Sequence, residues 1–361
     1  MHKVAMIARS TLYSIRGGDT VQVLETARHL LGLGVQVDIR LTDEVIDYAK
    51  YDLLHFFNII RPADMLFHIK RSGKPYVVST ILIDYSEYDK YQRKGVAGLV
   101  FRFLSADTIE YVKTIARWIL GKDRLMSKSY LWKGQYSSIC EILKNASMLL
   151  PNSTLEYERI VARYKTKTSY RVIPNGIDDH LFLPDITIEK DPLLVICAAR
   201  IEGVKNQLNL IKALNGTKYT VLLIGSPAPN QLNYDRACRQ IAGQNIHFVG
   251  QVSQKELLTY YNKAKVHILP SWFETTGLSS LEAAAMGCNV VISVNGDAKE
   301  YFGPDAFYCD PANLESIRAA VEQASEAPVN HSLRKKILEQ FTWQHAADST
   351  LLAYEKLFHT A

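Results

Sequence analysis

Short apolar runs alternate with amphipathic stretches along the whole chain. Helical periodicity is clearest over Thr20–Leu33 and Pro62–Ser72. In the first half, runs rich in β-branched and aromatic residues predict five strands: Val4–Ala8, Val35–Leu41, Leu53–Asn58, Tyr76–Leu82 and Met148–Leu150. Strands that alternate with helices in this way predict βαβ units and a parallel sheet.

The second half repeats this alternation more regularly. Its predicted strands are Leu193–Ala198, Thr220–Ile224, Ile246–Val249, Val266–Leu269 and Asn289–Val294. Gly225, Gly250 and Pro270 follow three of these strands, at the carboxyl ends where open α/β sheets place their ligand loops.

A break between the two halves is expected over Tyr170–Asn175, because Pro174-Asn175-Gly176 is a turn sequence. The stretch Asp179–Pro192 has the character of a linker. The tail Phe341–Phe358 predicts a long helix with Thr342 as its N-cap. A length of 361 residues suits two α/β domains better than one core.

Composition narrows the class of protein. Apolar residues make up 47% and charged residues 22%, as in a globular enzyme. No apolar run approaches the roughly 18 residues of a membrane-spanning helix, and the N-terminus does not have the pattern of a signal peptide. The cysteines are odd in number and widely spaced, which favours a reducing, cytoplasmic setting without disulfides or zinc: Cys140, Cys197, Cys238, Cys288 and Cys309.

The segment Pro270–Val291, PSWFETTGLSSLEAAAMGCNVV, carries the strongest chemical signal. A strand ends at Leu269 and a helix begins near Gly277, so the first free N–H groups, around Leu278 and Ser279, form an anion site. A diphosphate would lie there, and Glu282 could accept hydrogen bonds from ribose hydroxyls. Taken singly, Glu274 is more often a cap or surface carboxylate, and Glu282 a charge on a helix face.

A second segment, Ala199–Asn206, places Arg200 directly after a strand and Lys205 in the first turn of the next helix. Two cations there suit phosphate oxygens, although a solvated basic pair is the commoner outcome. No Asp-x-Asp motif is present to hold magnesium, so we expect no metal and no cofactor. The third segment, Arg16-Gly17-Gly18-Asp19, is a weak signal, and the GxGxxG fingerprint of dinucleotide enzymes is absent.

Together, the glycine pair at residue 17, PNGID at 174–178, R-x4-KN at 200–206 and E-x7-E at 274–282 resemble the retaining glycosyltransferases of family 4. The resemblance implies an α/β GT-B fold, in which two Rossmann-like domains with parallel sheets face each other across a cleft. It implies an acceptor domain of residues 1–172, completed by a closing helix at 343–361, and a donor domain of residues 173–342.

The same resemblance assigns roles to residues. Arg200, Lys205 and Glu274 would be catalytic, with the two cations on the leaving diphosphate and Glu274 near the transferred sugar. The nucleobase would lie against the turn Val249–Val252. The donor-binding set it implies is Gly17, Gly18, Arg200, Lys205, Val249, Gly250, Gln251, Glu274, Thr275, Thr276, Gly277, Leu278, Ser279 and Glu282.

One departure concerns the segment after the fourth strand, where family members usually carry a His that contacts the donor sugar. Here the segment Ser79–Tyr85 reads STILIDY and has no His. Asp84 is the candidate substitute as a sugar contact, and it is equally well explained as a turn residue.

The basic charge is concentrated in one segment. Residues 90–136 contain ten Lys and Arg against three acidic residues, although the whole chain has a net charge of +5. Within it, Gly95–Leu120 could form a helix that contacts an anionic membrane. A core-facing helix with a solvated basic face, or an acceptor groove for an anionic saccharide, remains the alternative. Nucleic acid is not expected, because no recognition motif accompanies the charge.

Together with these residues, the resemblance therefore implies a retaining, metal-independent hexosyltransferase of polysaccharide or glycoconjugate synthesis. It would use a nucleotide-diphosphate sugar donor and a saccharide or lipid-linked saccharide acceptor, in the cytoplasm or at the cytoplasmic face of the membrane. Two alternatives stay open. One is another GT-B enzyme, such as a nucleotide-sugar epimerase or a phosphorylase, and the other is a non-catalytic nucleotide- or saccharide-binding protein.

Overall fold

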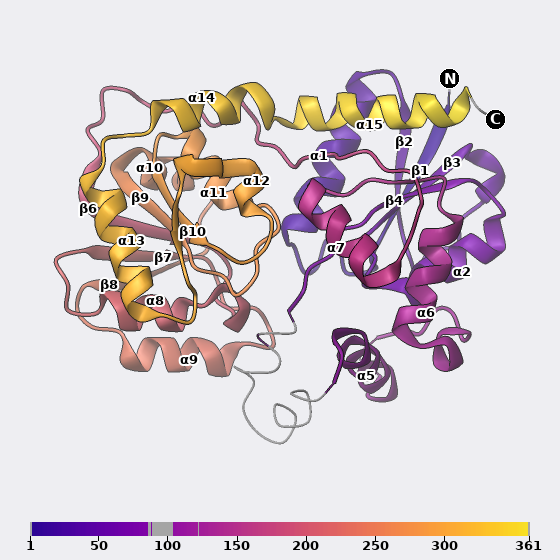
Figure 1. Ribbon diagram of the computed structural model, residues 1–361, viewed down its shortest axis with the longest axis horizontal. Coiled ribbons are helices and arrows are strands. Elements are labelled where there is room, and N and C mark those ends of the chain that lie inside the picture. The colour runs from indigo at the N-terminus through magenta and orange to yellow at the C-terminus, as the bar shows by residue number, and fades with distance from the viewer. Residues whose placement is uncertain (1, 86–87, 89–103, 122, 360–361) are drawn as a thin grey trace. The chain divides into compact units, whose positions relative to one another are not determined.

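The structure is a computed structural model that describes residues 2–85, 88, 104–121 and 123–359 (Figure 1). The described chain divides into two compact units. Unit 1 contains the described residues as far as Asn175, except Tyr88, and again from Trp343 onward, and unit 2 contains Tyr88 and Gly176–Thr342. The first boundary lies three residues beyond position 172, where the sequence analysis ended the first domain, and the second lies between 342 and 343.

Unit 1 is built on a parallel sheet with the strand order β2-β1-β3-β4-β5. Its strands are β1 (Lys3–Ala8), β2 (Gln36–Leu41), β3 (Leu53–Phe57), β4 (Tyr76–Ser79) and β5 (Met148–Leu149). The central strands β3 and β4 are buried along their whole length, which explains why their sequences are apolar apart from His55 and Ser79. The helices of this unit are α1 (Gly18–Gly32), α2 (Pro62–Ser72), α5 (Ala106–Ile119), α6 (Tyr130–Asn145), α7 (Thr154–Tyr164) and α15 (Trp343–Phe358), with a 3₁₀ turn at Tyr48–Lys50.

Unit 2 has a six-stranded parallel sheet with the order β11-β10-β9-β6-β7-β8. Its strands are β6 (Asp191–Ala198), β7 (Thr220–Ile224), β8 (Ile246–Gly250), β9 (Ala264–Leu269), β10 (Asn289–Ser293) and β11 (Phe307–Cys309). Its helices are α8 (Gln207–Leu214), α9 (Leu232–Ile241), α10 (Gln254–Lys263), α11 (Leu278–Ala285), α12 (Ala298–Phe302), α13 (Leu314–Glu326) and α14 (His331–Gln340). The sequence pattern missed β11, because a run of three residues is too short to show a period.

Two predicted segments differ in part from the structure. Of the run Gly95–Leu120, residues 95–103 lie outside the described residues, and the described helix is α5. The predicted linker Asp179–Pro192 is fastened to unit 2 by Lys190. The Lys190 ammonium is partly buried, and it donates to the carbonyls of Tyr261 at 2.6 Å and Met286 at 2.7 Å. Burial lowers the pKa of Lys190.

The closing helix α15 packs against α1 within unit 1 (Figure 1). Its fully buried Tyr354 meets the imidazole of His55 on β3, with 2.6 Å between the phenolic oxygen and Nδ1. The other ring nitrogen of His55 lies 2.8 Å from the Ser79 hydroxyl. Burial lowers the pKa of His55 to about 3, so the ring is neutral and joins the last helix of the chain to β3 and β4.

Tyr354→Phe tests this connection. The change leaves a buried ring nitrogen of His55 without a partner, so we expect a loss of about 1–3 kcal/mol in the free energy of unfolding. Urea unfolding followed by circular dichroism measures it. Leu352→Ala on the same helix is the control, because Leu352 is 49% exposed and should cost far less. Equal effects in the two variants would show that the buried hydrogen bond does not hold α15.

Candidate functional site

The structure brings Lys205 and Glu274 into direct contact at the carboxyl ends of two neighbouring strands of unit 2, β6 and β9. The Lys205 ammonium lies 2.7 Å from Oε2 of Glu274, and both side chains are largely buried. The Ser271 hydroxyl donates to the same carboxylate oxygen at 3.0 Å. The carboxyl ends of adjacent parallel strands share one edge of a sheet, which explains why residues far apart in sequence meet here.

The loop that carries Lys205 is shaped by Asn206. This residue is buried and has a left-handed backbone with φ 61°, and its side-chain amide donates to the carbonyls of Pro270 at 3.1 Å and Pro311 at 2.8 Å. The expectation that Lys205 lies in the first turn of a helix is wrong. Lys205 ends a 3₁₀ turn, Gly203–Lys205, because the left-handed Asn206 separates that turn from α8.

Arg200 follows β6, as predicted, and its guanidinium pairs with Glu202 at 3.0 Å. The side chain is 42% exposed, so it is accessible to an anion. Its backbone lies next to Gly225, which follows β7. A Cβ at Gly225 would come within 2.2 Å of the Ala199 carbonyl oxygen, and φ at Gly225 is 141°. A residue with a side chain at position 225 would therefore displace the loop that carries Arg200.

Glu274 is held by backbone contacts with the loop after β10. Its N–H donates to the Asn295 carbonyl at 3.2 Å, and its carbonyl accepts from the Asp297 N–H at 2.9 Å. A Cβ at Gly296 would lie 2.0 Å from the Glu274 carbonyl oxygen, so only glycine permits this approach. Ser271, Gly296 and Asn206 were not among the predicted site residues. A glycine two residues after a predicted strand was the available signal for Gly296.

Helix α11 begins beside Glu274. Gly277 is its N-cap, with φ 74°, and Leu278 and Ser279 form its first turn, as expected. The first amides of a helix have no acceptor within the helix, so this end carries partial positive charge. Thr275 precedes the turn, and the Thr276 hydroxyl lies 3.2 Å from the Tyr301 hydroxyl, to which it donates.

Glu282 lies further along α11 and accepts a hydrogen bond of 3.2 Å from the Tyr261 hydroxyl. Burial raises the pKa of Glu282 to about 7, and the hydrogen bond from Tyr261 opposes this shift. The group can therefore be neutral or charged near neutral pH. In either state it keeps oxygen atoms that can accept a hydrogen bond.

Val249, Gly250 and Gln251 lie at the end of β8. The Gly250 carbonyl accepts from the Gly225 N–H at 2.8 Å, which joins this turn to the loop after β7. Gly250 has φ 86°, a conformation that favours glycine. The predicted nucleobase turn thus belongs to the same edge of the sheet as Arg200.

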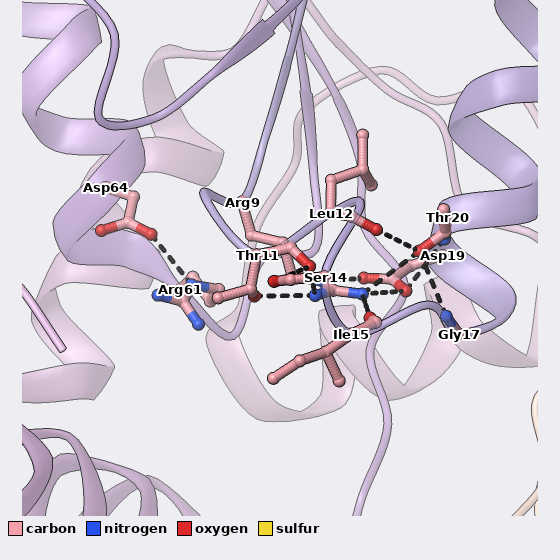
Figure 2. A network of polar contacts seen from close by, with 10 residues as sticks. All are labelled: Arg9, Thr11, Leu12, Ser14, Ile15, Gly17, Asp19, Thr20, Arg61 and Asp64. Carbon is pink, nitrogen blue, oxygen red and sulfur yellow. Dashed lines mark hydrogen bonds and ion pairs between the residues drawn. The ribbon is translucent and has the colours of Figure 1, made fainter. Parts of the chain in front are cut away.

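In unit 1, Gly17 and Gly18 lie at the start of α1, with Gly17 as the N-cap in an extended conformation. The loop before them is organised by Arg9, as Figure 2 shows. Its guanidinium makes a paired contact with Asp19 at 2.6 and 2.9 Å, and it donates to the carbonyls of Thr11 and Ile15. The sequence analysis did not single out Arg9, because one Arg after a strand carries no pattern.

The segment after β4, where the family His is missing, is held by a buried carboxylate. Glu156 of α7 is fully buried and accepts hydrogen bonds from the Thr80 hydroxyl at 2.5 Å, the Leu82 N–H at 2.7 Å and the Asn152 N–H at 2.8 Å. Between these contacts, Ile81 has φ 45°, a costly conformation for a β-branched residue. Asp84 follows and lies 4.0 Å from the Arg163 guanidinium.

Within the described part of the chain, metal ligands and cysteine thiols do not contribute to the candidate site. Among the residues that the structure describes, no group of three or more His, Cys, Asp or Glu could hold a metal ion. All five cysteines are free. Across residues 2–85, 88, 104–121 and 123–359, none of the helices is both long and apolar enough to pass through a bilayer.

Residues 181–340, which contain the whole Lys205–Glu274 site, match the family model of glycosyl transferases group 1. This part of the chain belongs to that family. Among curated relatives, a probable sucrose-phosphate synthase of Thermosipho melanesiensis is 25% identical over 94% of this chain and 91% of its own length. The MMP alpha-(1->4)-mannosyltransferase of Mycolicibacterium hassiacum is 27% identical over 51% of this chain, and the match spans 48% of that enzyme.

Solved structures show that the likeness in fold extends over the whole chain. The sucrose-phosphate synthase of Thermosynechococcus elongatus matches with a TM-score of 0.77 and 17% identity over 100% of both chains. HepE of Anabaena, solved in complex with UDP and glucose, matches with a TM-score of 0.71 and 14% identity over 98% of this chain and 100% of HepE. The expected GT-B class of fold, with two parallel α/β units, is thereby confirmed.

A buried histidine that contacts Ser280 of α11 generates a prediction about the pH dependence of the stability of unit 2. His267 of β9 is fully buried, and burial lowers its pKa to about 3. In the unfolded chain the ring takes up a proton below about pH 6.5. The contribution of His267 to the free energy of unfolding is therefore complete above about pH 6.5 and decreases as the pH falls toward 3. At pH 5 it has decreased by about 2 kcal/mol.

We expect His267→Leu to lose less stability than the unchanged protein between pH 7 and pH 5, measured by urea unfolding at both values. His180→Leu, which removes an exposed ring of unit 2, is the control and should leave the pH dependence as it was. An identical pH dependence in the His267 variant would show that this ring is protonated in the folded state.

Proposed function

We propose that this protein is a retaining glycosyltransferase that moves a hexose from a nucleoside-diphosphate donor to a saccharide or lipid-linked saccharide acceptor. The observation that carries the proposal is the contact of Lys205 with Glu274 beside the first turn of α11, inside the segment that matches the family. A cation, a carboxylate and a helix start are thus available at one place for a diphosphate and the sugar attached to it.

The proposed chemistry uses these groups in the following way. Departure of the nucleoside diphosphate breaks the bond between the anomeric carbon and the β-phosphate oxygen and builds negative charge on that phosphate. Lys205, Arg200 and the α11 amides stabilise the charge, each good contact being worth about 3 kcal/mol. The acceptor hydroxyl attacks on the same face and gives its proton to the leaving phosphate, and the anomeric configuration is retained.

The remaining groups bind the donor. Glu274 holds Lys205 in position and lies where the transferred sugar would be, and Glu282 accepts hydrogen bonds from ribose hydroxyls. The turn Val249–Gln251 takes the nucleobase, and the loop at Gly17 and Gly18 approaches the phosphates or the sugar. No metal and no cofactor takes part, because the two cations and the helix start supply the positive charge. Asp84 is the least supported of the expected donor contacts.

The identity of the donor is proposed from the structural relatives. HepE has been solved in complex with UDP-glucose, at 14% identity and a TM-score of 0.70 over 99% of this chain and 100% of HepE. A uridine diphosphate hexose is therefore the first donor to test. A nucleotide-sugar epimerase would use the same donor, but it would release an epimer in the absence of any acceptor.

The nucleotide assignment predicts specific effects of Lys205→Met and Arg200→Ala. Nucleoside diphosphates and their sugars should raise the melting temperature of the unchanged protein by mass action. In each variant this shift in melting temperature should disappear, and turnover should fall by about 10²–10³-fold. The reason is that each variant removes one charged contact to the leaving phosphate. Without ligand, Arg200→Ala should melt within a few degrees of the unchanged protein, because the Arg200 side chain is 42% exposed. Lys205→Met should melt at a lower temperature, because it leaves the largely buried Glu274 carboxylate without its cation.

Lys255→Met is the matched control, since Lys255 is an exposed lysine on α10 of the same unit. It should keep both the shift and the turnover. Unchanged activity in both site variants would remove the phosphate assignment. Strict dependence of turnover on a divalent metal would contradict the proposed mechanism.

We also propose that unit 1 contacts an anionic membrane at the cytoplasmic face through α5 and the start of α6. Only Ile109 of α5 is buried. Large apolar side chains are exposed at the end of α5 and the start of α6, among them Ile119 at 72%, Leu120 at 66% and Trp132 at 72%. Trp side chains with neighbouring Lys and Arg suit the interface of a bilayer that carries anionic lipids.

A double variant, Trp118→Ser with Trp132→Ser, tests this contact. We expect the unchanged protein to float with vesicles that contain phosphatidylglycerol at low salt, and the variant to bind several-fold more weakly. Leu232→Ser, which removes an apolar side chain of α9 that is 51% exposed, should float as before. A protein that stays at the bottom of the gradient in every case excludes the membrane contact.

A further inference from the structure

Unit 1 contains a cavity of about 630 Å³ that the proposed donor site does not use. Its walls come from the segment after β4, the start of α5, the middle of α6 and the end of α7. The side chains that matter for the argument are Asp84, Thr108, Tyr111, Lys133, Tyr136 and Arg163. The volume falls within the ~300–1,000 Å³ of pockets that bind small molecules.

A break in α6 forms one wall of this cavity. Gly134 interrupts the helix with φ 69° and ψ −175°, between Lys133 and Gln135. A Cβ at this position would meet nothing within 4 Å, so the glycine is needed for its backbone conformation and not for close packing. The buried Gln135 holds the break in place, since its side-chain amide donates to the Ile60 carbonyl at 2.9 Å.

The charges around the cavity are largely neutralised by one another. Arg163 pairs with Asp107 through Nε at 3.0 Å and Nη2 at 2.9 Å, and Lys133 pairs with Glu141. Asp84 lies 4.0 Å from Arg163, with about a third of its side chain exposed. In the lining, two cations thus face the two carboxylates of Asp84 and Asp107, and Lys133 is paired in addition with Glu141 outside the lining, which disfavours a phosphate or another strong anion as the ligand. A neutral molecule with many hydroxyl groups fits this balance.

Polar and aromatic groups lie together in the way that a sugar ring requires. A carboxylate accepts hydrogen bonds and a guanidinium donates them, so Asp84 and Arg163 can serve neighbouring hydroxyls of one ring. Tyr136 is 46% exposed, and its ring lies 5.5 Å from that of Tyr164. The Tyr111 hydroxyl is already used, donating to the Leu131 carbonyl at 2.7 Å. The tyrosine rings therefore offer apolar area with few polar demands of their own.

We propose that this cavity binds a neutral saccharide ring of the acceptor, held by Asp84 and Arg163 and packed against Tyr136. The inference rests on the proposed function, because a glycosyltransferase must bind the saccharide that accepts the transferred sugar. It assigns Asp84 to the acceptor and not to the donor sugar. The proposal also excludes an anionic saccharide as the ligand of this cavity, because Lys133 and Arg163 are paired with carboxylates.

Saturation-transfer NMR on the full chain tests the proposal with defined probes. The probes are the methyl glycosides of glucose, galactose, mannose and N-acetylglucosamine, with glucuronic acid and glucose 1-phosphate as anionic sugars. We expect at least one neutral glycoside to bind. Its signal should fall at least threefold in Asp84→Asn and in Tyr136→Ala, since each variant removes one of the two proposed contacts.

Asp43→Asn is the matched control, because Asp43 is an exposed carboxylate elsewhere in unit 1. It should leave the signal unchanged, and melting curves of all variants show that they are folded. The proposal is overturned if no neutral glycoside binds, if the anionic sugars bind more strongly, or if both cavity variants bind as the unchanged protein does.

The test separates this inference from the proposed function. Stabilisation by nucleoside diphosphates without any saccharide signal overturns the acceptor site and leaves the transferase proposal standing. A saccharide signal that depends on Asp84 and Tyr136, without stabilisation by any nucleotide, overturns the transferase proposal and leaves a saccharide-binding cavity.

Discussion

The ion pair between Lys205 and Glu274 is the interaction around which the candidate site is arranged. It joins the loops that follow two adjacent strands, β6 and β9, and it is largely shielded from water. A charge so placed needs a partner, because an unpaired charge in a buried site is costly. Each residue holds the other in place, and a ligand that carries its own negative charge can share the lysine.

This pair depends on backbone positions that tolerate few substitutions. Asn206 supplies a left-handed residue that ends the Lys205 turn, and its amide connects that turn to two neighbouring loops. Gly296 lets another loop approach the Glu274 carbonyl, and Gly225 does the same for the loop of Arg200. These residues touch no ligand in the proposed mechanism. They set the distances on which the charged groups rely.

Unit 1 is organised by buried polar groups of a different kind. Arg9 holds the loop before α1 through hydrogen bonds, and Glu156 does the same for the segment after β4. The His55–Tyr354 contact holds the last helix of the chain. Each group makes several hydrogen bonds, as buried polar groups must. The strained conformation of Ile81 lies within the segment that Glu156 holds, at the place where the family His is missing. Loops that bind ligands are often stabilised from beneath in this way.

Local patterns determined the larger features of this protein. Nearly all the strands, the helix start at Gly277, the long final helix and the charged residues after β6 and β9 follow from periodicity and from residues that break it. The family resemblance rests on motifs that are short and contiguous, which is why it could be read from the chain and why residues 181–340 match the family model.

Only the tertiary structure decided which of these residues meet. The Lys205–Glu274 contact spans 69 positions of sequence, the His55–Tyr354 contact spans 299, and no local pattern encodes either. The break at Asn206, the roles of Arg9 and Glu156 and the cavity at Asp84 depend equally on partners distant in the chain. Periodicity reports which face of an element is buried, whereas the position of a functional group is set by the packing of several elements at once.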